Sequence, residues 1–321
     1  MKYELAHYSL QGARRSNQDR VAVAERENAV LMVVADGLGG HKGGAIAAEL
    51  MTQWAVRAFR NIKQPVISQP SAFLAFTILQ AHDQITAYGQ EQHPPIKPRT
   101  TCVLSLVQNG YAYWAHVGDS RLYHYRENRL LKRTVDHSTI ERLHQSGVIS
   151  EDEMLTHPQK SAILKCVGGP KPPTISLGKE AVLHTGDALL LCSDGVWDAF
   201  SPEELSVYLQ RQALDESIEE LLHDAEAKMQ DACDNISAIC FRWEDDVTDS
   251  PPLQSKLDAT VDWQTLWEKA NKKAITQKAR KPATRAPQPS PKNVEKKTDK
   301  KEIKSTIAEL ENYLASLPRK R

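Results

Sequence analysis

Short segments rich in Val, Ile, Leu and aromatic residues recur along most of the chain, separated by Gly, Asn, Asp and Ser. Their length and composition predict β-strands. Gln108, Asn109 and Gly110 lie between two such segments, and this sequence is typical of a β-hairpin turn. We therefore predict strands over residues 3–9, 21–24, 30–35, 102–107, 111–117, 121–125, 188–192 and 236–241.

Other stretches space their apolar residues at helical intervals. Within residues 45–59, Ile46, Leu50 and Trp54 fall near one face, and residues 72–88 show the same periodicity. A third helical stretch is predicted over residues 202–229. Antiparallel strands interrupted by helices indicate an α+β fold in which helices pack on sheets, and argue against a doubly wound parallel sheet.

The charge of the chain is distributed unevenly. It contains 41 Lys and Arg residues and 41 Asp and Glu residues, so its formal net charge is zero. Residues 269–321 contain 16 basic and 5 acidic residues, whereas residues 1–268 contain 25 basic and 36 acidic residues. The body therefore carries a net charge of −11 and the C-terminal segment one of +11.

Composition also indicates the compartment and the state of the thiols. No apolar stretch approaches the roughly 20 residues that span a bilayer, and the N-terminus lacks the apolar core of a signal peptide. We therefore expect a cytoplasmic protein without a membrane span. Dispersed cysteines without a C-x-x-C pair predict buried reduced thiols rather than disulfides or a zinc site; they are Cys102, Cys166, Cys192, Cys233 and Cys240.

The sequence VVADGLGGHKGG, residues 33–44, follows a predicted strand with one carboxylate, Asp36, and five glycines. Glycine is costly to order, so a cluster of glycines marks backbone that turns sharply or approaches another group closely. Taken alone, the segment is compatible with a phosphate-binding or metal-binding loop and equally with a tight loop that carries a solvated Asp36.

Four more aspartates lie in comparable short motifs, most of them where a predicted strand gives way to Gly, Ser or Asn: Asp19, Asp119, Asp194 and Asp234. Gathered carboxylates repel one another and lose hydration, which raises their pKa values unless cations neutralise them. Oxygen ligands without His or Cys favour Mg²⁺ or Mn²⁺ over zinc. The pattern therefore predicts a site for hard divalent cations.

A series of motifs, in order, resembles the metal-dependent protein phosphatases, the type 2C serine/threonine class, in its bacterial form. The motifs are RRSNQD, VVADGLGGHKGG, TTCVLSLV, AHVGDSRLY, DHS with HPQKSAILKCVGG, GDALLLCSDGVWD and DNISAI, and they extend from about residue 3 to residue 241. The resemblance implies a catalytic domain over residues 1–244. It also implies a four-layer α-β-β-α sandwich in which two antiparallel sheets enclose a dinuclear metal site.

The resemblance further implies roles for individual residues. Asp36 would bridge two Mg²⁺ or Mn²⁺ ions and position the nucleophilic water, with the backbone carbonyl of Gly37 on one ion. Asp194 and Asp234 would hold the second ion, and Asp19 would act through water. A third, weaker ion would bind Asp119 together with Asp194, and Arg14 would clamp the phosphate of the substrate.

By resemblance, the chain is expected to hydrolyse phosphoserine and phosphothreonine in phosphorylated proteins and to oppose a bacterial serine/threonine kinase. The alternative is a catalytically inactive module of the same fold that binds phosphoproteins. Decayed members would be expected to lose bridging acids, whereas this chain retains its aspartates and Arg14. This feature favours activity.

Two segments of the catalytic domain leave roles open. Residues 137–169 resemble the mobile flap of the family, with helical character at residues 140–145, and are expected to influence substrate choice. Eukaryotic members have a histidine directly after the Asp-Gly pair, whereas Leu38 stands here and His41 follows three residues later. The general acid is therefore either His41 or a metal-bound or bulk water.

Beyond the catalytic domain, residues 245–301 read as a basic, largely disordered linker. Residues 302–321 carry apolar side chains at heptad-like steps and predict an amphipathic helix. This helix would bind a partner protein or dock on its own catalytic domain, and both interpretations stay open. Few aromatics accompany the lysines, so a nucleic-acid partner is not expected.

Overall fold

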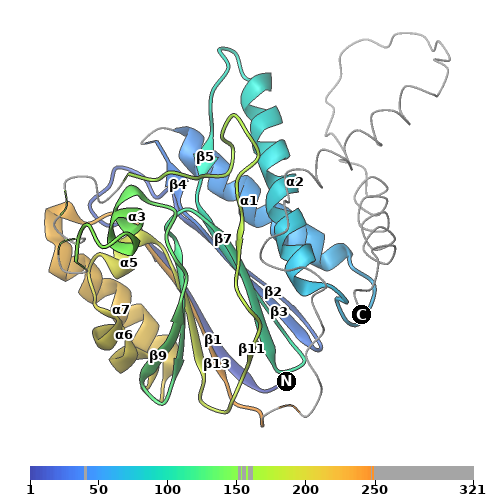
Figure 1. Ribbon diagram of the computed structural model, residues 1–321, viewed down its shortest axis with the longest axis vertical. Helices are drawn as coiled ribbons and strands as arrows, with labels where there is room; N and C mark the ends of the chain where they lie inside the picture. Colours follow the sequence, from blue (N-terminus) through green and yellow to red (C-terminus); the bar gives the residue numbers. More distant parts are fainter. Residues whose placement is uncertain (40–41, 151–152, 154–156, 158–161, 247, 249–321) are drawn as a thin grey trace.

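The computed structural model describes residues 1–39, 42–150, 153, 157, 162–246 and 248. Two antiparallel sheets lie face to face between two groups of helices (Figure 1). The prediction of a four-layer α+β sandwich is therefore confirmed. The expected C-terminal helix, and all but a few residues of the expected linker, lie outside the described residues.

The first sheet has five strands in the order β1 (Tyr3–Leu10), β13 (Ile236–Trp243), β12 (Ala188–Cys192), β8 (Arg121–Arg126) and β9 (Arg129–Arg133). Its outer face is covered by α5 (Asp194–Trp197), α6 (Pro202–Leu209) and α7 (Leu214–Met229). A short 3₁₀ turn, Gln230–Ala232, leads from α7 toward β13.

The second sheet has six strands. Five follow the order β10 (Ser176–Leu177), β7 (Tyr111–Val117), β6 (Cys102–Gln108), β3 (Ala29–Ala35) and β2 (Arg20–Arg26), and β11 (Ala181–Val182) also pairs with β7. Helices α1 (Lys42–Asn61) and α2 (Pro70–Glu91) cover its outer face. A separate ribbon joins β4 (Gly37–Leu38) to β5 (Arg99–Thr100), and α3 (Thr139–Gln145) follows β9.

Strand β3 shows why the sandwich has three apolar layers. All seven of its residues are buried, because successive side chains point to opposite faces and both faces are covered. Leu31 and Val33 pack toward α1 and α2, whereas Met32 and Val34 face the other sheet. A third layer lies between the first sheet and α5 to α7. The core therefore encloses the strand that ends at Asp36.

The predicted strands, the first two helices and the hairpin turn are confirmed, with Asn109 and Gly110 at φ values of 53° and 76°. The helical stretch predicted over residues 202–229 is confirmed as two helices, α6 and α7, with a break at residues 210–213. The Arg242 side chain of β13 donates hydrogen bonds to the carbonyl oxygens of Leu209, Arg211 and Gln212, which satisfies the carbonyl groups at the end of α6.

All five cysteines are free thiols, as predicted, and all except Cys166 are buried. Among the described helices, none combines the length and the apolar character that crossing a membrane requires.

Candidate metal centre

The register of the sheets brings the five aspartates to one end of the sandwich. Asp19 directly precedes β2 and Asp36 directly follows β3, and Arg20 pairs with Ala35 across these strands. Asp119 lies in the short turn that joins β7 of one sheet to β8 of the other. Asp194 begins α5 just after β12, and Asp234 lies just before β13. In an antiparallel arrangement these strand ends share one edge, so the predicted acids converge.

The backbone around Asp36 is fixed by the segment that enters β6. The Asp36 carbonyl oxygen accepts hydrogen bonds from the Thr101 amide at 2.8 Å and the Thr100 hydroxyl at 2.7 Å. A Cβ atom on Gly37 would lie 2.4 Å from the backbone of Gly44 in the first turn of α1. Glycine is therefore required here by close backbone approach, as the glycine cluster predicts.

Asp19 is buried and is oriented from the neighbouring strands. Its Oδ2 accepts a hydrogen bond of 2.6 Å from the hydroxyl of Ser193, the residue before Asp194. The preceding loop is held by Asn235, whose Oδ1 accepts from the Gln18 amide at 2.8 Å. The amide group of Asn235 also donates to the carbonyl oxygens of Gln11 and Ser16. These contacts make Ser193 and Asn235 positioning residues that the sequence analysis did not assign.

Arg14 and Asp234 contact each other directly. The Arg14 guanidinium donates from Nε to Oδ1 at 2.8 Å and from Nη2 to Oδ2 at 2.6 Å. The Arg14 side chain is 59% exposed and that of Asp234 is 35% exposed. The roles of Arg14 as a phosphate clamp and of Asp234 as a metal ligand stay predictions. Their ion pair shows that the two side chains lie next to each other.

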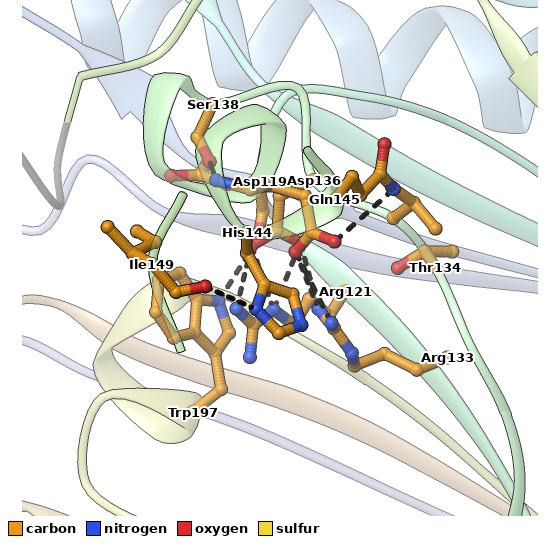
Figure 2. A network of polar contacts seen from close by, with 12 residues as sticks. Asp119, Arg121, Arg133, Thr134, Asp136, Ser138, His144, Gln145, Ile149 and Trp197 are labelled. Atoms are coloured by element: carbon orange, nitrogen blue, oxygen red, sulfur yellow. Dashed lines mark hydrogen bonds and ion pairs between the residues drawn. The ribbon is translucent and has the colours of Figure 1, made fainter. Parts of the chain in front are cut away.

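Asp119 is held by a network that extends toward α3 (Figure 2). Its backbone carbonyl accepts a hydrogen bond of 3.0 Å from Trp197 Nε1 of α5. The Arg121 guanidinium lies 3.7 Å from the centroid of the Trp197 ring and forms a bidentate ion pair with buried Asp136. Arg133 of β9 continues the network through an ion pair of 3.3 Å with Glu141 of α3.

Burial and mutual repulsion dominate the electrostatics of the acids. Burial raises the pKa of Asp36 well above its ordinary range, and the charges of Asp194, Asp19, Asp119 and Asp234 raise it further. Burial and the charges of Asp119, Asp234 and Asp19 raise the pKa of Asp194 in the same way. The pKa of Asp19 rises to about 6 through burial, although the Ser193 hydrogen bond opposes this shift. Burial raises the pKa of Asp119 to about 7. Bound cations would therefore stabilise the charged form of these aspartates.

The donor set fits divalent ions that retain water. Oδ1 of Asp19 and Oδ1 of Asp119 are buried and lack a hydrogen-bond partner within the described ranges. In the same ranges, no three His, Cys, Asp or Glu side chains are close enough to hold an ion by themselves. Mg²⁺ commonly takes one or two carboxylates and keeps several waters, and Mn²⁺ shares this preference for oxygen ligands. Aspartates that converge at one end of the sandwich supply oxygen donors that suit such an ion.

Asp198 is a further acid that the sequence analysis did not assign. Its charge contributes to the raised pKa of both Asp119 and Asp194. It follows Asp194 by four residues at the end of α5, a spacing that places two helical side chains on one face. The sequence analysis could have identified Asp198 from this spacing. His41, the alternative general acid, lies outside the described residues, whereas the expected helical stretch of the flap is confirmed as α3.

Comparisons with known proteins agree with this geometry. The family model described as "Protein phosphatase 2C" matches residues 9–234. A Streptococcus pyogenes protein named as protein phosphatase 2C-type is 31% identical over 237 residues, which cover 73% of this chain and 95% of the relative.

Solved structures show the same similarity. The Streptococcus agalactiae serine/threonine phosphatase is 28% identical with a TM-score of 0.69, covering 76% of this chain and 100% of the other. The catalytic domain of the serine/threonine protein phosphatase PstP, solved in complex with two manganese ions, is 26% identical with a TM-score of 0.65. That match covers 76% of this chain and 99% of the other. With its family model, its fold and its five converging aspartates in agreement, the chain belongs to the protein phosphatase 2C family.

Proposed function

We propose that this chain is a metal-dependent protein serine/threonine phosphatase that hydrolyses phosphoserine and phosphothreonine in protein substrates. The observation that carries the proposal is the convergence of five aspartates from both sheets at one end of the sandwich, with raised pKa values for Asp36 and Asp194. Membership of the protein phosphatase 2C family and the likeness to bacterial serine/threonine phosphatases support the same activity.

We assign the ions to the aspartates by matching motif positions. Asp36 would bridge two Mg²⁺ or Mn²⁺ ions with help from the Gly37 carbonyl, Asp194 and Asp234 would hold the second ion, and Asp19 would contribute through water. Asp119, with Asp194, would hold a third, weaker ion. When bound, the ions would neutralise the acids and the phosphate and supply hydroxide from bound water near pH 7. The two manganese ions in PstP support a dinuclear site.

The chain's own residues would hold the site and bind the phosphate. Thr100 and Thr101 fix the backbone of Asp36, and Ser193 orients Asp19. The fork of Arg14 suits bidentate contact with phosphate oxygens, and its exposed side chain can exchange Asp234 for a phosphate.

A cysteine nucleophile does not fit this chain. Burial raises the pKa of all five thiols, so none is prepared as a thiolate; they are Cys102, Cys166, Cys192, Cys233 and Cys240. The alternative of an inactive phosphoprotein-binding module is not favoured, because all five aspartates are present and converge at one end of the sandwich.

The wider context of the enzyme is also proposed. We infer that residues 1–244 form the catalytic domain and that a serine/threonine kinase supplies its substrates in the cytoplasm. The basic segment 245–301 and the helix expected at 302–321 would serve a protein partner or dock on the catalytic domain.

The decisive experiment is hydrolysis of a phosphothreonine peptide by the purified protein with Mn²⁺, Mg²⁺ or EDTA. We expect turnover that requires a metal and is lost in Asp36→Asn. The matched control is Asp246→Asn, which makes the same change at an exposed aspartate and should retain activity. Absence of turnover with either metal in a folded sample would reject the proposed function.

A further inference from the structure

A second surface feature lies beside the flap, between the edges of the two sheets. It is a groove of about 410 Å³ between residues 132–135, at β9, and residues 176–179, at β10. Its floor is formed by Trp114 and His116 of β7. β9 and β10 are the outermost strands of their sheets within the described part of the chain, so each has one edge without a partner strand.

The groove is cationic in a body that carries a net charge of −11. Its lining contains Lys132, Arg133 and Lys179 and no carboxylate. Arg133 is already paired with Glu141. Neither lysine forms an ion pair with any described carboxylate, and Lys132 Nζ lies 5.5 Å from the centroid of the Trp114 ring. Two ammonium groups are therefore available to an anionic ligand.

His116 adds a directional polar group to the floor. It is 4% exposed, and its Nε2 lies 2.8 Å from the carbonyl oxygen of Val135, which makes Nε2 the donor. Burial lowers the pKa of His116, so the ring is neutral and Nδ1 is an acceptor. Nδ1 is buried without a hydrogen-bond partner among the residues that the structure describes. Because this nitrogen is buried, the affinity of the groove for a peptide rests on the two lysines and not on His116.

Strand β7 connects this floor to the metal centre. His116 precedes Asp119 by three residues and Trp114 precedes it by five. At about 3.3 Å per residue, and with Asp119 in the turn just after the strand, these side chains lie at most roughly 10 and 16 Å from the position of Asp119. A bound peptide in extended form has the same rise, so its residues three to five positions from the phosphorylated residue would reach the groove.

We propose that this groove binds an acidic, extended segment of the phosphoprotein substrate, three to five residues from the phosphorylated side chain. The inference rests on the proposed phosphatase function and defines its substrate class as phosphoproteins with acidic residues at that spacing. Charge complementarity selects this occupant over the chain's own residues 269–321, because that segment carries a net charge of +11 and would be repelled by the lysines.

The test compares phosphothreonine peptides that carry three acidic or three neutral residues at positions three to five, on either the N-terminal or the C-terminal side. With the full-length protein and Mn²⁺, we expect kcat/KM to be about three to ten times higher for the acidic peptide than for the neutral peptide when the charged residues lie on one of the two sides. The difference should come from a lower KM for the acidic peptide. The ratio should fall toward one in Lys132→Gln/Lys179→Gln and with rising salt. Lys63→Gln, which removes an exposed lysine outside the groove, should leave both values unchanged.

Two further measurements separate the groove from the catalytic proposal. Para-nitrophenyl phosphate is too small to reach the groove and reports the metal centre alone. Fluorescence anisotropy of a labelled, unphosphorylated acidic peptide measures binding to the groove without catalysis. We expect the wild type to bind this peptide and Lys132→Gln/Lys179→Gln to raise its Kd about three- to tenfold. Turnover without acidic preference, or peptide binding that is equal in the double variant, would overturn the groove. If the wild-type protein hydrolyses neither the phosphopeptides nor para-nitrophenyl phosphate but still binds the acidic peptide, the phosphatase function would be overturned instead.

Discussion

The carboxylate of Asp187 allows a quantitative test of the electrostatics at the end of the sandwich away from the metal centre. Asp187 is 0% exposed and lies just before β12. It accepts two hydrogen bonds from Arg126, at 2.7 and 2.8 Å, one of 2.8 Å from His124 and one of 3.1 Å from the His184 amide. Burial alone would raise its pKa, but these donors lower the pKa from 3.8 to about 2.

The direction and size of the effect on stability follow from this value. A lowered pKa means that the folded state favours the carboxylate, so the contribution is complete above pH 3.8 and declines as the pH falls toward 2. A tenfold change in proton affinity is worth about 1.36 kcal/mol, which gives about 2.4 kcal/mol at pH 7 and about 1.3 kcal/mol at pH 3. Asp187→Asn should therefore destabilise the protein by about 2–4 kcal/mol at pH 7, because buried His124 and half-buried Arg126 also lose their partner.

The assay is urea unfolding followed by tryptophan fluorescence, at pH 7, 4 and 3, with EDTA present throughout so that metal binding does not contribute. The difference in unfolding free energy between wild type and Asp187→Asn should shrink by roughly 1 kcal/mol between pH 7 and pH 3. Asp246→Asn, at an exposed position, is the matched control and should show no such trend. A penalty for Asp187→Asn that stays constant with pH, or one below about 0.5 kcal/mol at pH 7, would refute the reasoning.

Other substitutions test the metal centre and its supports. In EDTA, Asp36→Asn should raise the melting temperature, since it removes a carboxylate whose charge is opposed by burial and by four neighbouring acids, and a lower melting temperature would contradict this. Gly37→Ala should lower the unfolding free energy by at least about 2 kcal/mol, measured by calorimetry, and reduce phosphatase activity, because its Cβ would overlap the backbone of Gly44. Gly43→Ala is the control and should be tolerated, since its Cβ would meet Pro98 at an ordinary 3.6 Å. Arg121→Lys should cost about 2–3 kcal/mol in urea unfolding, because lysine cannot pair bidentately with Asp136; equal stability would count against that pair.

The fold was largely predictable because its strands are short, strongly apolar and bounded by turn residues. Residues 29–35 illustrate this: a strand covered on both faces is apolar throughout, and that signal is local. β9 was not predicted because its sequence RLLKR is largely exposed and does not alternate between apolar and polar residues. The break between α6 and α7 was missed because it depends on Arg242, a residue about 30 positions away in sequence. Contacts of that kind leave no local pattern.

The metal centre was predictable for a different reason. Acids at the ends of antiparallel strands must share an edge once the register is set, so Asp19 and Asp36 could be placed together from strand positions alone. The contact between Arg14 and Asp234 could not be inferred, because it depends on how two loops without regular structure meet. The supporting hydrogen bonds of Ser193 and Asn235 were equally out of reach, although both residues lie within the motifs.

The two ends of the same sheets treat their carboxylates in opposite ways. At one end Asp187 is surrounded by donors that outweigh the effect of burial, so its pKa falls and its hydrogen bonds stabilise the fold. At the other end Asp36 and Asp194 face other acids and their pKa values rise, so their placement opposes folding until cations bind. That cost has to be offset by packing, and β3, which ends at Asp36, is buried on both faces. A strand that is apolar throughout therefore ends at an acid whose charge opposes folding, and the burial of β3 on both faces helps to hold this acid in place before the ions bind.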